Sequence, residues 1–570
     1  MAGIIRCSPF LFFMLDSTVG WGGVKTCFSS SIILSLPFYV VFLHHNQNLS
    51  VIMEQLKILP IGIQNFESLR KDGFLYVDKT ELIYKLIKGG RYYFLSRPRR
   101  FGKSLLMSTI HAVFDGKREL FDGLAIADKP DMDWAKHPVF HLDLNTEKYD
   151  SKERLEGQLN NFLAQQEAIY GKNENEVSFG LRFEGVIQRA YDKTGKGVVI
   201  LVDEYDKPML QAIGNEELQN EFRNTLKGFY GALKSKDGCI KFALLTGVTK
   251  FGKVSVFSDL NNLKDISMDR RFVEVCGLTE TEITTTLAKY VEGFADACGM
   301  TFEETVAKMK KMYDGYHFRE DTIGMYNPFS VLNALDSHDF GSYWFETGTP
   351  TYLAELLRKH NYNLARMATC QTTVKVLDSI DPNSTSPIPV IYQSGYLTIK
   401  DYDPQFKLYT LGFPNEEVEE GFIDFLMPYY TPVCQDETAF NIHEFVMDVN
   451  AGNTEQFIKR LKSLFADTPY ELVQDLENHY QNVIWIVCKL MGFHVQAEYH
   501  TSEGRIDLVL QTPKFCYVME FKLDGTAEEA LAQIEDTHYT LPFEQNGQKI
   551  IRIGMNFSSE TRNIEKVIVR

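Results

Sequence analysis

A phosphate-binding loop is indicated near residue 100. The tripeptide Gly102-Lys103-Ser104 follows a β-like apolar run at 92–95 and precedes a helical pattern at 105–110. Glycine lets the backbone approach a phosphate closely, and N–H groups at a helix start point at the anion. Lys103 adds positive charge, and the Ser104 hydroxyl can bind Mg²⁺. Strand, loop and helix in this order predict a nucleoside triphosphate site.

Three arginines distinguish this loop from the usual G-x-x-x-x-G-K-[ST] pattern. Arg97 stands where the first glycine is expected, and Arg99 and Arg100 follow it. We predict that their guanidinium groups contact phosphates in addition to Lys103, because guanidinium binds phosphate oxygens well. The alternative is a solvated turn.

Two acidic residues follow a second apolar run. Asp203 and Glu204 come directly after residues 197–202. Such a run is typical of a buried parallel strand, and ligands bind beyond the carboxyl ends of such strands. We predict that Asp203 holds Mg²⁺, directly or through water, and that Glu204 orients or deprotonates the attacking water. An ordinary polar turn after a strand is the alternative.

A third apolar run, residues 241–249, is expected to be another strand of the same sheet. Thr246, near its end, is placed either to sense the γ-phosphate or to cap the strand. Arg270 and Arg271 follow at some distance. For these two we favour a solvated turn over an arginine finger.

A second set of chemically suited residues lies near the C-terminus. Asp507 falls in an expected strand at 504–510, and Glu520 and Lys522 fall in another at 515–523. Residues i and i+2 of a strand face the same side. Two carboxylates beside a lysine can bind Mg²⁺ and activate water against a phosphodiester, while the lysine orients the nucleophile or stabilises developing charge. An exposed Glu/Lys pair on a solvated face is the alternative.

The elements that would position this second set follow the order α-β-β-β-α-β. Their expected bounds are 471–490, 493–498, 504–510, 515–523, 527–539 and 549–555. Residues 471–570 contain nine Lys and Arg against 15 Asp and Glu. Because DNA affinity depends on neutralising phosphates, this region alone should bind DNA poorly. Another part of the chain or a protein partner is expected to present the substrate.

The first set of motifs resembles the bacterial AAA-ATPase-like family, whose members are P-loop ATPase modules. The resemblance covers roughly residues 55–345, and members of the family tend to have arginine in place of the first P-loop glycine. The resemblance therefore implies a protein that binds and hydrolyses ATP. The segments that carry it are Leu59-Pro60-Ile61-Gly62, 74–80, 96–104, Val202-Asp203-Glu204-Tyr205-Asp206 and Tyr313-Asp314-Gly315-Tyr316.

The second set resembles the PD-(D/E)XK nuclease superfamily, with residues 504–507 and 520–522 as the match. The resemblance implies a Mg²⁺-dependent nuclease acting on DNA. It also implies that Gln533 lies near the site. Glu477 is the expected additional acid on the first helix, and Glu471 is the alternative.

The region between the two motif sets is expected to be mostly helical. Residues 279–297 and 302–312 have helical spacing, and Asn327-Pro328 is typical of a helix start. Residues 392–399 and 406–411 predict a hairpin, and helices followed by a hairpin suit a winged helix by analogy. Residues 440–464 predict a helical connector. The expected domains are 53–284, 285–440 and 441–570, in an α/β multidomain fold with a P-loop parallel sheet and a C-terminal restriction-endonuclease-like domain.

The first 52 residues differ in composition from the rest. They contain three formal charges and apolar runs at 10–15 and 32–43 that are shorter than a membrane span requires. We favour a start at Met53, with 1–52 as non-native sequence; a targeting or anchor segment and a structural extension are the alternatives. N-terminal sequencing of the native protein distinguishes them.

The composition is ordinary for a soluble multidomain protein. The chain has 570 residues, 44% hydrophobic and 24% charged, and a net charge of −17, so bulk charge does not attract nucleic acid. Nine cysteines without a C-x-x-C pair argue against disulfides and zinc ribbons and fit the cytoplasm. We expect ATP and Mg²⁺ as cofactors. We expect DNA, a second copy of the chain in a homo-oligomer or a protein partner as contacts, and no association with a membrane. The competing hypothesis is a nucleotide-switched binding protein with a catalytically inactive nuclease fold.

Overall fold

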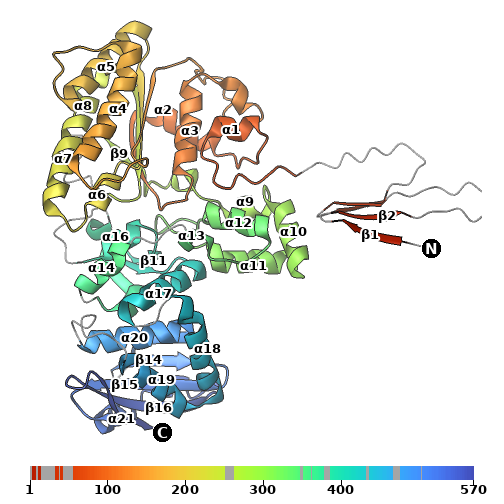
Figure 1. Cartoon of the computed structure of the whole chain (residues 1–570), viewed down its shortest axis with the longest axis vertical. Coiled ribbons are helices and arrows are strands. Elements are labelled where there is room, and N and C mark those ends of the chain that lie inside the picture. The colour runs from red at the N-terminus through yellow and green to blue at the C-terminus, as the bar shows by residue number, and fades with distance from the viewer. Residues whose placement is uncertain are drawn as a thin grey trace, which may run out of the picture.

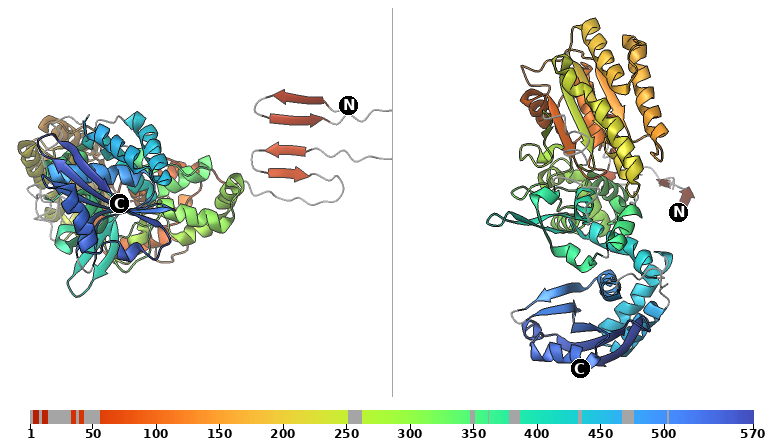
Figure 2. Two further views of the ribbon diagram at one scale, coloured as in Figure 1. Left: turned by 90° about the horizontal axis from the view of Figure 1, so that it is seen from below. Right: turned by 90° about the vertical axis from the view of Figure 1, so that its left-hand side faces the viewer.

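Three parts follow one another along the long axis of the molecule (Figure 1). The computed structural model describes residues 56–250, 262–346, 351–360, 362–377, 386–431, 435–466, 476–501 and 504–570, together with four short strands before residue 43. A parallel sheet with its helices lies at one end, a mostly helical region in the middle and a mixed sheet at the other end, as the side view in Figure 2 also shows. The protein is therefore α/β and multidomain, as predicted.

The N-terminal sheet consists of five parallel strands in the order β6-β7-β8-β5-β9. Every residue of β5 and β7 is buried, because helices cover both faces of the sheet. The strands are β5 (Tyr92–Ser96), β6 (Val139–Asp143), β7 (Val198–Asp203), β8 (Ile240–Gly247) and β9 (Lys264–Asp265).

Helices occupy both faces of this sheet (Figure 1). On one side, α3 packs against β6, β7 and β8, with α1 beside it. On the other side, α4, α5 and α7 pack together, and the rings of Phe183 and Phe229 stack at 4.4 Å between α5 and α7. The helices are α1 (Phe66–Lys71), α2 (Thr80–Gly89), α3 (Lys103–Phe114), α4 (Lys152–Tyr170), α5 (Phe179–Thr194), α6 (Lys207–Gln211), α7 (Glu216–Tyr230) and α8 (Ala232–Ser235).

The strand register brings the carboxyl ends of the strands to one edge. Asp203 of β7 lies opposite Asp143 of β6, and Ser96 of β5 lies opposite Gly247 of β8. The loop after β5, the acids after β7 and the end of β8 therefore meet, which is where parallel α/β sheets bind ligands.

The middle region begins with helices whose starts are capped by side chains. Thr279 and Thr301 form capping boxes. Asn327 caps the helix that begins at Pro328, and the sequence predicted this helix start. The helical elements are α9 (Glu280–Thr284), α10 (Ala288–Cys298), α11 (Phe302–Tyr313), α12 (Pro328–Ser337), α13 (Tyr343–Glu346), α14 (Thr351–Lys359), η4 (Leu364–Thr369), α15 (Val374–Leu377) and α16 (Ile388–Gln393).

A small antiparallel sheet of three strands follows, in the order β10-β12-β11. The predicted hairpin is present as β11 (Thr398–Asp403) and β12 (Leu408–Gly412), but β10 (Cys370–Thr373) was not predicted. Residues 392 and 393, predicted to begin the hairpin, instead end the buried helix α16. A short apolar run does not distinguish a strand from a buried helix. The winged-helix analogy stays a prediction.

Three helices connect this region to the C-terminal sheet: α17 (Glu416–Tyr430), α18 (Gln435–Ala451) and α19 (Thr454–Ala466). The prediction of one helical connector over residues 440–464 is wrong in one respect, because one helix ends at Ala451 and the next begins at Thr454. Gly452 there has φ +72°, a conformation that a helix interior does not allow.

The C-terminal sheet is mixed, with the strand order β13-β14-β15-β16-β17. Only β15 and β16 are parallel, and α21 (Ala527–Asp536) connects them. The predicted order is confirmed, with β17 as an additional strand. The elements are α20 (Leu476–Leu490), β13 (His494–His500), β14 (Arg505–Gln511), β15 (Phe515–Leu523), β16 (Lys549–Ser558) and β17 (Asn563–Val569).

The N-terminal segment contains two antiparallel strand pairs, β1 (Gly3–Cys7) with β2 (Phe10–Met14) and β3 (Ile33–Leu36) with β4 (Tyr39–Phe42). The favoured start at Met53 lies outside the described residues. Among the residues that are described, no helix has both the length and the apolarity needed to cross a bilayer.

Candidate nucleotide and nuclease sites

The predicted phosphate-binding loop runs from the end of β5 to the first residue of α3. Gly102 caps that helix in the left-handed conformation, with φ +91°, and α3 begins at Lys103. Arg100 also has a positive φ, of +64°, which is uncommon for a residue with a side chain. The loop thus turns sharply and directs the helix N-terminus toward the edge of the sheet.

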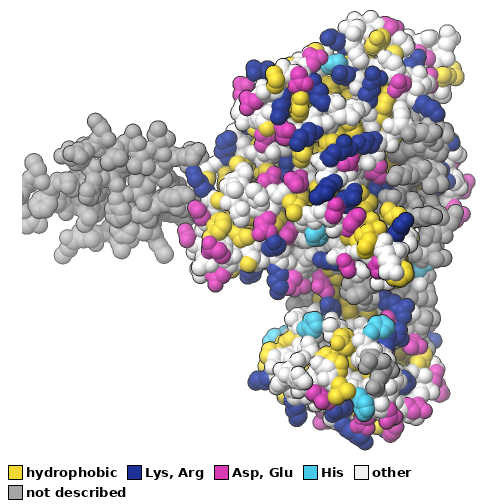
Figure 3. All heavy atoms as spheres, turned by 180° about the vertical axis from the view of Figure 1, so that it is seen from behind, with side chains coloured by type: hydrophobic (Ala, Val, Ile, Leu, Met, Phe, Trp, Pro, Cys, Tyr) yellow, Lys and Arg dark blue, Asp and Glu magenta, His cyan; other side chains and the backbone are white. Residues whose placement is uncertain are grey.

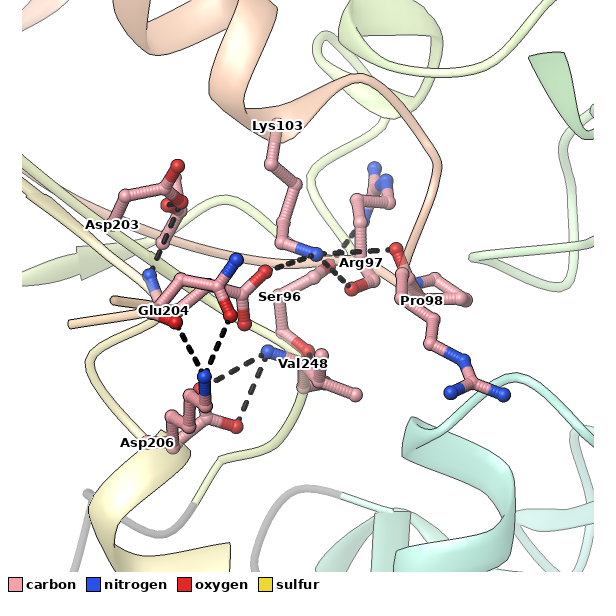
Figure 4. Close-up of polar contacts among 12 residues, drawn as sticks. Ser96, Arg97, Pro98, Lys103, Asp203, Glu204, Asp206 and Val248 are labelled. Atoms are coloured by element: carbon pink, nitrogen blue, oxygen red, sulfur yellow. Dashed lines mark hydrogen bonds and ion pairs between the residues drawn. The ribbon is translucent and has the colours of Figure 1, made fainter. Parts of the chain in front are cut away.

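The ammonium group of Lys103 lies inside the loop (Figure 4). Its Nζ atom donates to the carbonyl oxygens of Arg97 and Pro98 at 3.1 and 3.2 Å, and it forms an ion pair with Glu204 Oε1 at 3.2 Å. Only 3% of its side chain is exposed. The charge that the sequence assigned to a phosphate is therefore placed between the loop and the acid after β7.

Arg97 lies among carbonyl groups of neighbouring loops, and its predicted contact with phosphate stays a prediction. Its side chain is buried, and its guanidinium donates to the carbonyl oxygens of Ser96 at 2.9 Å and Ser267 at 2.8 Å. It also lies 3.8 Å from the centre of the Phe318 ring. Burial lowers the pKa of this guanidinium to about 10. The arginine is held by carbonyl groups of the surrounding loops and stabilises the fold of the loop from within.

The two acids at the end of β7 have different partners: Asp203 is hydrogen-bonded to Thr246, whereas Glu204 is paired with Lys103. Asp203 accepts hydrogen bonds from the Thr246 hydroxyl at 2.5 Å and from the Glu204 N–H at 3.1 Å. Thr246 is completely buried, and its hydroxyl orients the Asp203 carboxylate. Its predicted role toward a γ-phosphate stays a prediction. Thr246 at the end of β8 and Asp203 at the end of β7 are therefore joined by a hydrogen bond.

Glu204 stands in the left-handed region, with φ +53°. Burial raises the pKa of its carboxyl, while the nearby charge of Lys103 opposes that shift. Burial likewise raises the pKa of Asp206, which accepts from the Val248 N–H at 3.2 Å and the Thr249 N–H at 2.6 Å. Asp206 therefore anchors the loop after β8 and leaves Glu204 as the acid beside Lys103.

A cavity of about 510 Å³ opens in front of the loop, a size in the range of small-ligand sites. Arg99, Arg100, Gly102, Lys103 and Ser104 line it together with Glu204. The remaining lining residues are Pro60, Gly62, Ile63, Gln64, Leu105, Asn145, Lys207, Leu210, Gln211, Val248, Pro328, Phe329, Leu332, Ser394 and Tyr396. The middle region thus forms one wall of the cavity.

Arg270 and Arg271 line a different, open hollow of about 780 Å³. Arg271 pairs with Asp269 at 2.5 Å, and Arg270 lies 3.6 Å from Asp321 and is largely exposed. Both arginines lie in an exposed turn, as we favoured, and neither lines the cavity at Lys103.

The C-terminal carboxylates lie where two strands part. The β14–β15 ladder ends at the pair Leu508 and Met519. Beyond it, Asp507 Oδ2 accepts the Phe521 N–H at 2.8 Å, and Glu520 Oε2 accepts the Asp507 N–H at 3.4 Å. The two side chains thus replace ladder hydrogen bonds and face each other across the gap.

A chain of side-chain contacts holds the lysine of this site. Lys522 Nζ donates to Gln533 Oε1 at 2.6 Å and to Glu520 Oε1 at 3.3 Å. Gln533 Nε2 in turn donates to the Tyr539 hydroxyl at 3.3 Å. Gly504 allows the close approach of Tyr539, because a Cβ atom at residue 504 would lie 2.5 Å from that hydroxyl. The sequence-predicted Gln533 lies at the site, and Tyr539 was missed.

Burial and mutual repulsion govern the acids of this second site. The pKa of Glu520 is raised by burial and by Asp507, and the pKa of Asp507 is raised chiefly by burial, with Glu477 contributing. Glu477 is an exposed residue in the first turn of α20, and Glu471 lies outside the described residues. Two carboxylates are the hard oxygen ligands that Mg²⁺ prefers, and a cation would relieve their repulsion.

The carboxylates of Asp507 and Glu520 can supply some, but not all, of the ligands of a divalent metal ion. Within the part of the chain that the structure describes, no three His, Cys, Asp or Glu side chains are close enough to hold a metal ion together. Asp507 and Glu520 would therefore hold Mg²⁺ with water or with oxygens of the substrate as the other ligands.

Two family models match the parts of the chain that contain these candidate sites. Residues 60–257 match the family model described as predicted AAA-ATPase, and residues 475–567 match the PD-(D/E)XK nuclease superfamily. A protein described as uncharacterized, in the vnfD 5′ region of Azotobacter chroococcum mcd 1, is 34% identical over 532 residues, which are 90% of this chain and 99% of that protein. The chain belongs to the AAA-ATPase-like family. Its C-terminal part belongs to the PD-(D/E)XK nuclease superfamily.

In this AAA-ATPase-like protein, several residues of the nucleotide cavity were not predicted. Asn145 and Lys207 follow β6 and β7, and Lys207 Nζ donates to Asn145 Oδ1 at 2.9 Å. The position of Asn145 just after an apolar run was the available signal, the same one that identified Asp203. Phe329 and Tyr396 come from the middle region, and nothing local in the sequence indicates that they reach the loop.

Proposed function

We propose that this AAA-ATPase-like protein binds ATP with Mg²⁺, hydrolyses it, and cleaves DNA with a Mg²⁺-dependent nuclease domain. The observation that carries the nuclease proposal is the facing pair Asp507 and Glu520 with Lys522 held beside it. The observation that carries the ATP proposal is Lys103, buried at the N-terminus of α3 within reach of Glu204.

At the nucleotide site, each residue has a distinct task. Lys103 and the N–H groups of the α3 N-terminus bind the β- and γ-phosphates, and the Ser104 hydroxyl and Asp203 hold Mg²⁺. The raised pKa of Glu204 suits a group that takes a proton from water near neutral pH. Once phosphates bind Lys103, its ion pair with Glu204 is weakened and the carboxylate is available to orient the attacking water.

At the nuclease site, bound Mg²⁺ would neutralise phosphate charge and acidify water. Asp507 and Glu520 hold that ion, because both present oxygens to the gap between β14 and β15. Lys522, oriented by Gln533, is placed to position the nucleophile or to stabilise charge on the phosphate. Glu477 is proposed as an additional acid from α20.

DNA is proposed to contact more than the nuclease domain. The acidic balance of residues 471–570 does not favour phosphate binding. On the face shown in Figure 3, Lys and Arg side chains lie across the upper and central parts of the molecule among acidic ones. We propose that DNA is presented to the nuclease domain by the ATPase and middle parts, by a second copy of the chain or by a protein partner. We propose that the protein acts in the cytoplasm and that its domains divide after residues 284 and 440.

A cleavage assay on the full chain tests the nuclease proposal. Circular and linear DNA and RNA are incubated with Mg²⁺ or Mn²⁺, with and without ATP, and Asp507→Asn and Lys522→Met are compared with the parent. Metal-dependent DNA cleavage that both variants lose supports the proposal. Variants that cleave as well as the parent contradict the assigned site.

The second candidate function is a nucleotide-switched binding protein with an inactive nuclease fold. The observation in its favour is that the described residues bring together two acids and no third ligand. A folded protein that binds ATP and DNA but leaves every DNA form intact with either metal favours this candidate over the first.

A further inference from the structure

The phosphate-binding loop is embedded in aromatic side chains of the middle region. The ring of Phe101 packs edge-on against Tyr316 at 4.8 Å and against Phe318 at 5.6 Å. The Arg97 guanidinium also lies over the Phe318 ring, 3.8 Å from its centre, and the Arg100 guanidinium lies 5.0 Å from the centre of the Phe329 ring. The predicted phosphate-binding loop is thus in direct contact with the next part of the chain.

Within this interface, Arg99 faces both the cavity and the middle region. It lines the cavity in front of Lys103, while its Nη2 atom donates to the Tyr396 hydroxyl at 3.1 Å. Its carbonyl oxygen accepts the indole N–H of Trp344 at 3.0 Å, and its guanidinium lies 5.4 Å from that ring. Tyr396 and Trp344 are almost completely buried, so a change at Arg99 must be accommodated by the packing around them.

Trp344 connects this contact to α17. The main-chain N–H of Trp344 donates to Glu417 Oε1 at 2.6 Å, and the Ser330 hydroxyl donates to Glu417 Oε2 at 2.7 Å. Glu417 lies in the first turn of α17 and is completely buried. A buried carboxylate depends on such hydrogen bonds, so α17 is sensitive to the position of Trp344.

The helix α17 packs along α20 of the nuclease domain. Near one end of the pair, Lys489 forms an ion pair with Glu419 at 2.6 Å, and near the other end the rings of Tyr430 and His479 stack at 6.5 Å. The two helices are therefore antiparallel and joined along their length. The far end of α20 carries Glu477, whose charge acts on Asp507 of the nuclease site.

We propose that Arg99 is the residue through which the nuclease domain senses nucleotide: a phosphate that draws its guanidinium away from Tyr396 releases α17 and thereby α20. A guanidinium–phosphate contact is charge-assisted and stronger than the contact with a phenol hydroxyl, so nucleotide provides the required difference between the two states. The inference rests on the proposed ATP binding. On this proposal Arg99 acts on the nuclease site indirectly: through α17 and α20 it sets the position of Glu477.

Hydrogen exchange of the full chain tests this proposal without depending on DNA cleavage. Exchange of the amides of α17 and α20 is followed by mass spectrometry with and without ATP and Mg²⁺, and ATP binding is measured separately by calorimetry. We expect ATP to speed exchange in both helices by about fivefold, a typical coupling between sites. Arg99→Ala should show the faster exchange without nucleotide, and ATP should change it no further.

Two further variants separate the steps. Lys489→Met removes the ion pair between the helices and leaves the cavity intact, so ATP should still alter α17 while its effect on α20 falls. Arg154→Ala removes an exposed arginine of α4 and is the matched control, which should respond as the parent does.

The outcomes are distinguishable. Failure of the parent to bind ATP contradicts the proposed function and this inference together. A parent that binds ATP while the exchange of α17 and α20 stays the same overturns the inference alone. An Arg99→Ala protein that binds ATP and retains the full ATP-dependent change in α20 also overturns it.

Discussion

Lys103 and Glu204 form an ion pair across the phosphate-binding loop, with 3.2 Å between Nζ and Oε1. The group expected to bind phosphate and the group expected to act on water are thus paired with each other. Binding of nucleotide must exchange this contact for phosphate contacts, which links occupancy of the site to the protonation and freedom of Glu204.

The first prediction separates binding from hydrolysis at this pair. Lys103→Ala should abolish measurable ATP binding, because it removes the buried positive charge at the α3 N-terminus. Glu204→Gln should keep ATP affinity within about threefold of the parent and reduce hydrolysis by about 100-fold or more, the usual loss for a general base. Calorimetry and phosphate release measure the two effects. ATP binding by Lys103→Ala at parental affinity would show that the loop is not the nucleotide site.

The second prediction concerns Arg97, which is buried among carbonyl groups. Arg97→Gly restores the usual loop glycine but leaves those carbonyls and the Phe318 ring without their partner. We expect a loss of about 3 kcal/mol or more in the free energy of unfolding, because buried acceptors lose a charged donor. Denaturant unfolding of the full chain measures it, with Arg154→Ala as the exposed control. A Gly variant as stable as the parent would contradict the role given to Arg97.

The third prediction is a dependence of stability on pH in the absence of metal. Burial and Asp507 raise the pKa of Glu520 to about 7, above the ordinary value of about 4.3. The stability linked to this group is therefore complete below about pH 4.3 and is lost as pH rises through about 7. We expect Glu520→Gln to remove this loss, as followed by thermal unfolding at several pH values.

Divalent metal provides the complementary measurement for the same group. Mg²⁺ or Mn²⁺ should restore the parent's stability at pH 7 to 8 and should have little effect on Glu520→Gln, because the ion binds the ionised pair. Equal metal stabilisation of parent and variant would place the metal elsewhere.

The fourth prediction tests the support of Lys522. Gly504→Ala brings a Cβ atom against the Tyr539 hydroxyl and should destabilise the protein by about 1–3 kcal/mol and lower DNA cleavage. Tyr539→Phe in the same protein removes the clashing oxygen and should recover most of the stability. Gly238→Ala is the matched control, since a Cβ atom there meets nothing within 4 Å. An unaffected Gly504→Ala protein would contradict the contact.

Local sequence patterns were sufficient to place the candidate site residues that lie within one strand or loop. Lys103 and Ser104 follow an apolar strand and begin a helix, Asp203 follows another, and Glu520 and Lys522 are two apart on a third. Each of these relationships depends on neighbours along the chain, and strand and helix geometry is regular enough to convert spacing into position. The order of elements around Asp507 was predictable for the same reason.

Contacts between distant segments could not be inferred in this way. The inward turn of Arg97 depends on carbonyls of residues near 267, the role of Thr246 depends on the register of β7 with β8, and the wall of the cavity comes from Phe329 and Tyr396. Tyr539 reaches Gln533 only because Gly504 makes room. The sequence alone determined which residues could bind phosphate and metal. Tertiary packing decided which of them face the cavity and which support it, because burial and hydrogen-bond partners depend on segments hundreds of residues apart.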